Sequence, residues 1–100
     1  MTGEEGRGGL EREMGLDHAD FWRLLPQALG PHAWKREGNR VTVEIGGGHV
    51  EIELGPQRER RIALMTIPAT PVSISWRGVD RDTRARFLER FDSYYRRGGG

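Results

Sequence analysis

Residues that could do chemistry gather around position 17, where the chain reads Asp17-His18-Ala19-Asp20. Carboxylates and an imidazole within one helical turn are ligands for a divalent metal, and the same groups could act as acid and base. A metal site, however, needs several ligands to converge, and nothing in this spacing requires it. Asp17 is well placed to cap a helix, and Asp20 falls in the first turn, where the helix dipole favours an acid. We therefore predict no metal and no cofactor, and keep an enzyme or metal site around the first helix as the lesser alternative.

Nucleophilic catalysis is not favoured elsewhere in the chain. Ser73 and Ser75 lie in a strand-like stretch and not at a glycine-bracketed strand-to-helix elbow. The chain has no cysteine, which removes disulfides, thiolate metal sites and cysteine nucleophiles. The sequence therefore favours a non-catalytic protein over an enzyme.

A second alternative is nucleic-acid binding by arginines near the C-terminus. Arg86, Arg90 and Arg97 fall on one edge of a predicted helix, and such a row could contact phosphates. Acidic residues of the same helix share its polar face, which is more typical of a solvated, ion-paired helix. We keep Arg-mediated nucleic-acid binding as the alternative function.

Two helices follow from the hydrophobic spacing. Asp17 is the expected N-cap of a helix over 18–29, whose apolar residues recur three and four positions apart before a stop at Gly30. Asp80 is the expected cap of a second helix over about 81–97, which carries an apolar stripe on one side.

The middle of the chain changes to a period of two, which indicates strands. Alternating apolar residues over 41–45 and 50–54 predict a hairpin, and a two-residue turn at 47–48 would pair Val43 with Ile52. That pairing keeps the apolar residues of both strands on one face. We expect an antiparallel arrangement because the turn is so short.

Further strands are expected on both sides of this hairpin. The stretch 60–67 is apolar on both faces and reads as a central strand, 67–71 (IPATP) reads as a turn, and 72–76 alternates again. A short strand around 33–36 is expected before the hairpin. Together these elements predict a two-layer α+β sandwich in the order α-β-β-β-β-α. An antiparallel meander of four to five strands carries the N-terminal and C-terminal helices on one face.

The predicted functional surface is the face of the sheet that the helices leave open. On the expected register it shows small or adaptable side chains flanked by acids on one side and by arginines on the other, a composition suited to receiving a partner or a second copy. These candidate partner-binding residues are Arg61, Ala63, Met65, Ser73, Ser75 and Arg77. We therefore expect a small non-catalytic binding or assembly module that acts through this face, on a protein partner or on a second copy of the chain.

Composition sets the domain organisation. Residues 1–16 hold many glycines and charges and few apolar side chains, which predicts a disordered leader; 17–97 form one domain and 98–100 a flexible glycine tail. No apolar stretch approaches the ~20 residues of a membrane helix, and the start lacks a signal peptide, so we expect a cytoplasmic protein with no membrane partner. Residues 1–54 carry six basic and ten acidic side chains, and 55–100 carry ten and five, so the two halves have opposite net charge.

Overall fold

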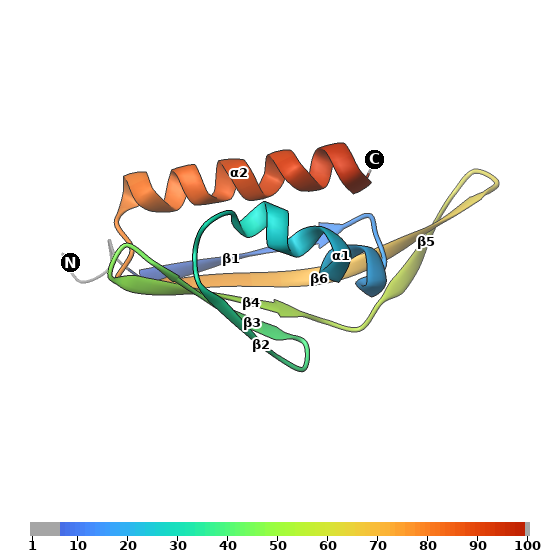
Figure 1. The fold of residues 1–100 in the computed structure, drawn as a ribbon. Helices are drawn as coiled ribbons and strands as arrows, with labels where there is room; N and C mark the ends of the chain where they lie inside the picture. Colours follow the sequence, from blue (N-terminus) through green and yellow to red (C-terminus); the bar gives the residue numbers. More distant parts are fainter. Residues whose placement is uncertain (1–6, 100) are drawn as a thin grey trace.

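The computed structural model describes residues 7–99 of the chain, and the side chains up to Arg96. It is a two-layer α+β fold in which a six-stranded antiparallel sheet carries both helices on one face (Figure 1). This confirms the predicted fold class, although the first helix follows a strand that the sequence did not predict. The elements are β1 (Arg7–Met14), α1 (His18–Leu29), β2 (Trp34–Glu37), β3 (Arg40–Ile45), β4 (Gly48–Leu54), β5 (Arg58–Ile62), β6 (Met65–Arg77) and α2 (Arg81–Gly99).

The long strand β6 lies at the centre of the sheet. The strand order is β1-β6-β4-β3-β2, and β5 pairs with the first part of β6 outside this path. Only β2, β3 and β4 therefore form the expected meander. The C-terminal part of β6 is enclosed by β1 on one side and β4 on the other.

Strand β1 corrects the predicted disordered leader over residues 7–14. It pairs with β6 along its whole length, from Arg7 opposite Arg77 to Met14 opposite Thr70. Leu10 and Met14 also pack against the hydrophobic core. The composition suggested too little apolar surface for folding, but a strand added to an existing sheet edge also gains the backbone hydrogen bonds of its partner. Residues 1–6 of the predicted leader lie outside the described part of the chain.

The β3–β4 hairpin has the predicted facing but a different register. The turn is Gly46-Gly47, both with positive φ, and it pairs Val43 with Val50 instead of Ile52. The shift is two residues, so the apolar side chains stay on the helix-facing side. Gly48 is instead the first residue of β4, where its backbone lies so close to the next strand that an added Cβ would be 2.2 Å from the carbonyl oxygen of Arg77.

The predicted central strand over 60–67 is wrong, and so is the turn over 67–71. The chain turns at residues 63–64, and β6 then runs straight through both prolines. β6 pairs with β5 up to Ala69 and with β4 from Val72, so Pro71 lies where one neighbour replaces the other. The carbonyl of Pro71 accepts a hydrogen bond from Gly55 N–H (2.8 Å). The nitrogen of Pro71 faces the same side, at the junction where β4 follows β5 as the neighbour of β6. Because no ladder partner is needed at this junction, the proline, which has no N–H, leaves no ladder position unpaired.

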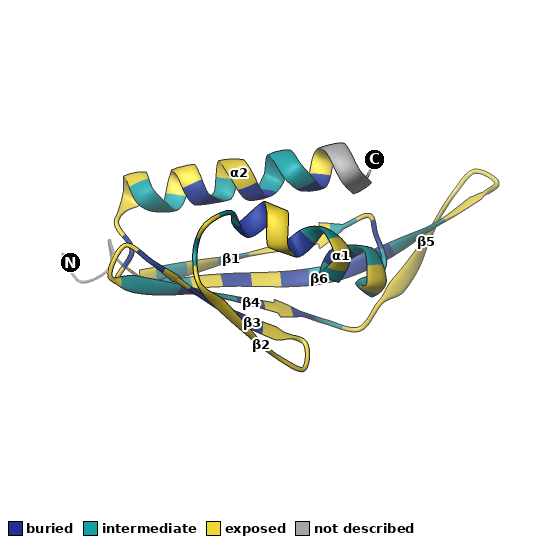
Figure 2. Cartoon of the chain, viewed as in Figure 1, coloured by how far each residue is buried: buried dark blue, intermediate teal, exposed yellow. Residues whose placement is uncertain are grey.

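The core lies between the sheet and the two helices, where the dark blue segments of Figure 2 face one another. Phe21 and Leu25 of α1 and Phe91 of α2 are fully buried, and Tyr95 is nearly so. The rings of Phe21 and Tyr95 stack with centroids 5.1 Å apart, and the Tyr95 hydroxyl donates to the Phe21 carbonyl (2.8 Å). The two helices are therefore held together as well as held against the sheet.

Helix α2 begins after its cap residue, Asp80, and continues into the terminal glycines. The Asp80 carboxylate accepts from Thr83 N–H (2.7 Å), which confirms the predicted cap and lowers the pKa of that carboxyl. The helix runs on to Gly99, two residues beyond the predicted end at about 97, and Gly100 lies outside the described residues. Each added N–H can still bond to a carbonyl one turn back, which offsets a propensity loss of about 1 kcal/mol per glycine. Within residues 7–99, neither helix has both the length and the apolar content needed to cross a membrane.

The close approach at Gly48 gives the first testable prediction. In Gly48→Ala, the added methyl would sit 2.2 Å from Arg77 O and 2.4 Å from Gly78 O, both on the backbone and unable to yield cheaply. We expect the free energy of unfolding to fall by at least about 2 kcal/mol in urea denaturation. Gly15→Ala is the matched control, since a Cβ there meets nothing within 4 Å. Equal stabilities of the two variants would show that Gly48 does not lie this close to the backbone of Arg77 and Gly78.

The buried hydroxyl of Tyr95 predicts sensitivity to alkali. Burial raises the pKa of Tyr95 above its ordinary value of 10.0, so the unfolded chain loses this proton first as the pH rises. Stability from this group should be fully present below about pH 10 and should fall by about 1.4 kcal/mol per pH unit above it. Tyr95→Phe should be less stable at neutral pH by about 0.5–1.5 kcal/mol, through the lost hydrogen bond to Phe21. Its stability should nevertheless decline less steeply above pH 10 in urea denaturation, and parallel declines would contradict the prediction.

Candidate functional site

The sheet face opposite the helices is polar across its central strands. Strand register places Thr42 beside Glu51 and Glu51 beside Ser75, and the next row places Glu53 beside Ser73. Ser73 and Ser75 are exposed, each next to a glutamate of β4. This part of the open face therefore lacks the adaptable apolar surface that the sequence predicts for it.

The structure divides the predicted partner-binding residues into two groups. Ser73, Ser75 and Arg77 lie on the open face of the sheet, as expected. Arg61, Ala63 and Met65 instead belong to the hairpin formed by β5 and the start of β6. The division follows from the length of β6, because one strand carries Met65 at its first position and Arg77 at its last.

This hairpin, residues 58–69, projects beyond the body of the molecule and is called the arm below (Figure 1). Figure 2 shows its far end exposed on both strands. Ile62 is 54% exposed, Leu64 102% and Met65 62%, so the tip of the arm is both apolar and open to solvent. The sequence prediction placed Ile62 and Leu64 in the core. The signal that could have corrected it is that two prolines follow within ten residues, which argues against the expected position in a sheet centre.

The stem of the arm is basic. Residues 58–69 carry three arginines and one glutamate. Arg60 forms an ion pair with Glu13 of β1 (3.1 Å), which ties the stem to the edge of the sheet. Arg58 and Arg61 are exposed. The arm thus presents an apolar tip above a positively charged stem.

The turn at the tip is unusual in its residues. Ile62 pairs with Met65, which leaves a two-residue loop, and Ala63 has a φ of 57° where glycine is the usual residue. Ala63 is the one non-glycine residue with positive φ among those the structure describes. Positive φ costs an L-residue about 1–2 kcal/mol, so the loop holds a strained conformation at the most exposed point of the arm.

A second exposed apolar site lies at the β2 edge of the sheet. Trp34, on the short edge strand β2, is 38% exposed. Together with Ala33, Lys35, Thr42 and Glu44 it lines a hollow of about 410 Å³, called the edge pocket below. Trp34 and the three residues of the arm tip are the exposed large hydrophobic side chains among residues 7–96. The surface therefore carries two separate apolar sites.

The arginines of the nucleic-acid alternative do not form a uniform row. Arg90 donates from Nε (3.3 Å) and Nη2 (3.1 Å) to the carbonyl of Gln27, at the C-terminal end of α1, and its guanidinium lies 4.8 Å from the centre of the Tyr94 ring. Arg86 is exposed, and the side chain of Arg97 lies outside the described residues. Arg90 is thus used to hold the two helices together, and nucleic-acid binding through α2 stays a prediction.

The titratable groups at the start of α1 have structural partners. Asp17 caps the helix by accepting from Asp20 N–H (2.8 Å), and Asp20 pairs with Arg23 (3.1 Å). The His18 Nε2 atom lies 2.8 Å from the carbonyl oxygen of Gly55. Across the described chain, no three His, Cys, Asp or Glu side chains converge as metal ligands would. The structure therefore does not bring these residues together into a reactive cluster.

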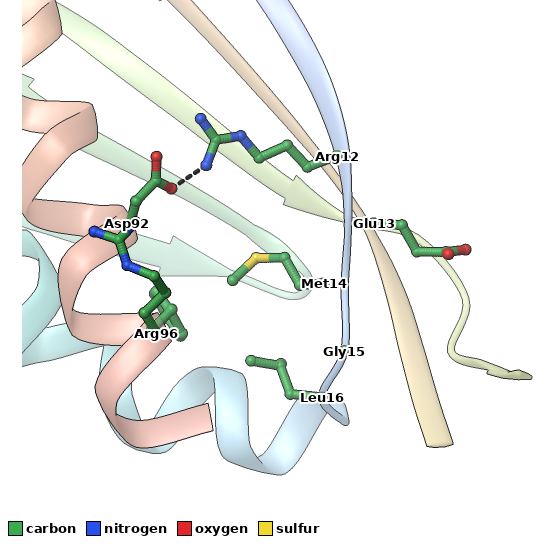
Figure 3. Close-up of a pocket in the computed structure, with 8 residues that line it drawn as sticks. Arg12, Glu13, Met14, Gly15, Leu16, Asp92 and Arg96 are labelled. Atoms are coloured by element: carbon green, nitrogen blue, oxygen red, sulfur yellow. Dashed lines mark hydrogen bonds and ion pairs between the residues drawn. The ribbon is translucent and has the colours of Figure 1, made fainter. Parts of the chain in front are cut away.

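Another hollow, of about 390 Å³, lies between the end of β1 and α2 (Figure 3). The guanidinium of Arg12 points across it and forms an ion pair with the carboxylate of Asp92. Met14 and Leu16 supply apolar walls, and Arg96 stands at its rim. Because its two facing charges neutralise each other, this hollow reads as the joint between β1 and α2 and not as a ligand site.

Comparison of the chain with known proteins finds no family model, no curated protein and no solved structure that matches it. The functional interpretation therefore depends on the arm, the edge pocket and the open face.

The strained turn predicts a stabilising substitution. Ala63→Gly should relieve the positive φ, partly offset by the greater freedom of glycine in the unfolded chain. The arm should gain up to about 1 kcal/mol, seen as about fivefold slower amide hydrogen exchange across Ile62 and Met65. Thr66→Gly, on the same hairpin but with no positive φ, is the control and should exchange faster. Faster exchange in Ala63→Gly would show that the turn is not strained.

Proposed function

We propose that this protein is a non-catalytic assembly module in which the arm of one copy binds the edge pocket of another. The observation that carries the proposal is the exposure of Ile62, Leu64 and Met65 together at the tip of the arm. Isolated apolar residues on a surface are ordinary, but a contiguous group on a projecting element is typical of an interaction site. Such a tip gains most from a partner that removes it from water.

A second copy fits the tip because the chain itself carries a matching apolar site. Trp34 is 38% exposed and is among the residues that line the edge pocket, and its register partner Val43 places its side chain toward the helix-facing side of this edge. Tryptophan is among the residues most enriched at the energetic centre of interfaces. The tip offers Leu64 and Met65, and the unbranched, flexible side chain of Met65 can fill an irregular hollow. Contact between the two sites would cover all four exposed large hydrophobic residues of the described chain.

Charge supports the same pairing. The arm stem exposes Arg58 and Arg61. The edge pocket is lined by one acid and one base, Glu44 and Lys35, and the open face beyond it continues with Glu51 and Glu53. Opposite charges around an apolar contact steer the encounter and fix its orientation. The acidic N-terminal half and the basic C-terminal half of the chain thus meet across the proposed contact.

The contact has to form between copies and not within one. β2 is separated from β6 by β3 and β4, and the arm leaves the sheet along β6 (Figure 1). The sheet therefore holds the tip and the edge pocket of one chain apart. Because the two contacting surfaces differ, the proposed interface is of the head-to-tail type.

Self-association is tested by sedimentation velocity over a concentration series. The wild type should associate at or below about 1 mM, the concentration at which a contact of about −4 kcal/mol is half formed. Met65→Glu should weaken association at least tenfold, because a carboxylate in an apolar contact costs more than about 1.4 kcal/mol. Thr66→Glu puts the same charge on the next residue, which faces the other way in the strand, and should weaken it less. A wild type that stays monomeric throughout overturns the proposal.

A mixing experiment separates tip-to-pocket contact from tip-to-tip contact. Met65→Glu keeps the edge pocket and loses the tip, whereas Trp34→Ser keeps the tip and loses the pocket. Each variant alone should be monomeric, and their mixture should form a 1:1 complex and nothing larger, since only one intact contact remains. Circular dichroism checks that both variants are folded. If the mixture stays monomeric while the wild type associates, the edge pocket is not the receiving site.

A further inference from the structure

Three basic side chains lie side by side on the open face, where β4, β6 and β1 run together. Arg77, the last residue of β6, pairs directly with His49 of β4 on one side and with Arg7 of β1 on the other. Directly opposed residues of neighbouring antiparallel strands project from the same face, with Cβ atoms about 4.5–5.5 Å apart. The register therefore aligns two guanidinium groups and an imidazole in one row, and Glu44 of β3 follows on the far side of His49.

This row is not neutralised in the way that other arginines of the sheet are. Arg40 lies opposite Glu53 and pairs with it, and Arg60 pairs with Glu13. Neither Arg7 nor Arg77 has an ion pair with any described residue. Like charges directly opposite each other in a sheet are destabilising. The position thus carries an electrostatic cost that a bound anion would remove.

The same residues line a hollow of about 340 Å³, with Gly8, Glu51, Ser75 and Trp76. Hydrogen-bond donors dominate this lining, since the Ser75 hydroxyl lies beside the row and arginine side chains only donate. The Trp76 side chain is directed to the helix-facing side, where Arg84 of α2 lies 4.7 Å from its ring centre, so its indole N–H is not one of these donors. Glu51 is the single carboxylate of the lining.

We propose that this hollow, called the anion site below, binds one oxyanion group, a carboxylate or a phosphate. Arginine offers a planar fork of donors that matches the oxygens of either group, and two forks facing one site can hold it from both sides. Glu51 disfavours a second negative charge nearby, so the site selects a small anion and not a polyanion. The inference is independent of the proposed assembly, which uses the arm and the edge pocket.

The test is a titration followed by ¹H–¹⁵N NMR, carried out in the Met65→Glu background so that self-association does not interfere. Sodium phosphate and sodium acetate are added separately, with sodium chloride as the ionic-strength control. We expect saturable shifts at the backbone amides of Arg7, Ser75 and Arg77 and at the arginine Nε–H groups. Saturation by phosphate alone or by acetate alone identifies the group, and saturation by both assigns the shared oxyanion chemistry.

Matched variants make the assignment specific. Arg77→Gln should lower the affinity at least about tenfold, and Arg7→Gln should do the same by removing the other fork. Arg40→Gln, an arginine of the same face that already has a carboxylate partner, should bind as the parent does. Shifts that do not saturate with either anion, or an affinity unchanged in Arg77→Gln, overturn the proposal.

Discussion

Strand β6 is the element on which the rest of the structure depends. Its residues from Thr70 to Arg77 pair with β1, those from Val72 to Arg77 pair with β4 on the other side, and the first five pair with β5. One continuous strand thus forms the centre of the sheet and half of the arm. At the junction, Ala69 and Thr70 are fully buried, and the Thr70 hydroxyl donates to the Leu16 carbonyl (2.8 Å). The arm is therefore a stiff extension of the sheet and its direction is set by the core.

The distribution of apolar surface follows from that arrangement. Both helices cover the same face of the sheet. The apolar residues that alternate along β3, β4 and β6 pack beneath the helices, and the residues between them leave the other face polar. The remaining large apolar side chains lie where no helix reaches, at the tip of the arm and at the β2 edge. Exposure at these two places cannot contribute to the stability of a single chain. The proposed contact with a second copy rests on this exposure of apolar side chains that the single chain does not bury.

Strand register also decides which charged side chains of the sheet lie opposite one another. Where the register places an arginine opposite a glutamate, as for Arg40 and Glu53, the pair is satisfied within the chain. Where it places Arg77 between Arg7 and His49, neither arginine has a carboxylate directly opposite it or an ion pair with a described residue. Arg90 shows the opposite outcome, since a residue that looks available for phosphate instead caps the neighbouring helix through Gln27. Availability of a cation is thus decided by its neighbours and not by its residue type.

The sequence by itself determined the local elements and their facing. α1 has the predicted bounds, Asp80 caps α2, and the alternation in β3 and β4 puts the apolar side chains toward the helices, because each of these depends on residues close in the chain. Only the tertiary structure decided which strands become neighbours. β1 orders because β6 supplies a hydrogen-bonding edge, and Ile62 is exposed because β4 pairs with the far end of β6 and not with β5. A strand pattern fixes the facing of side chains, whereas partner and register depend on backbone hydrogen bonds and close contacts between segments distant in the sequence, such as Gly48 against Arg77.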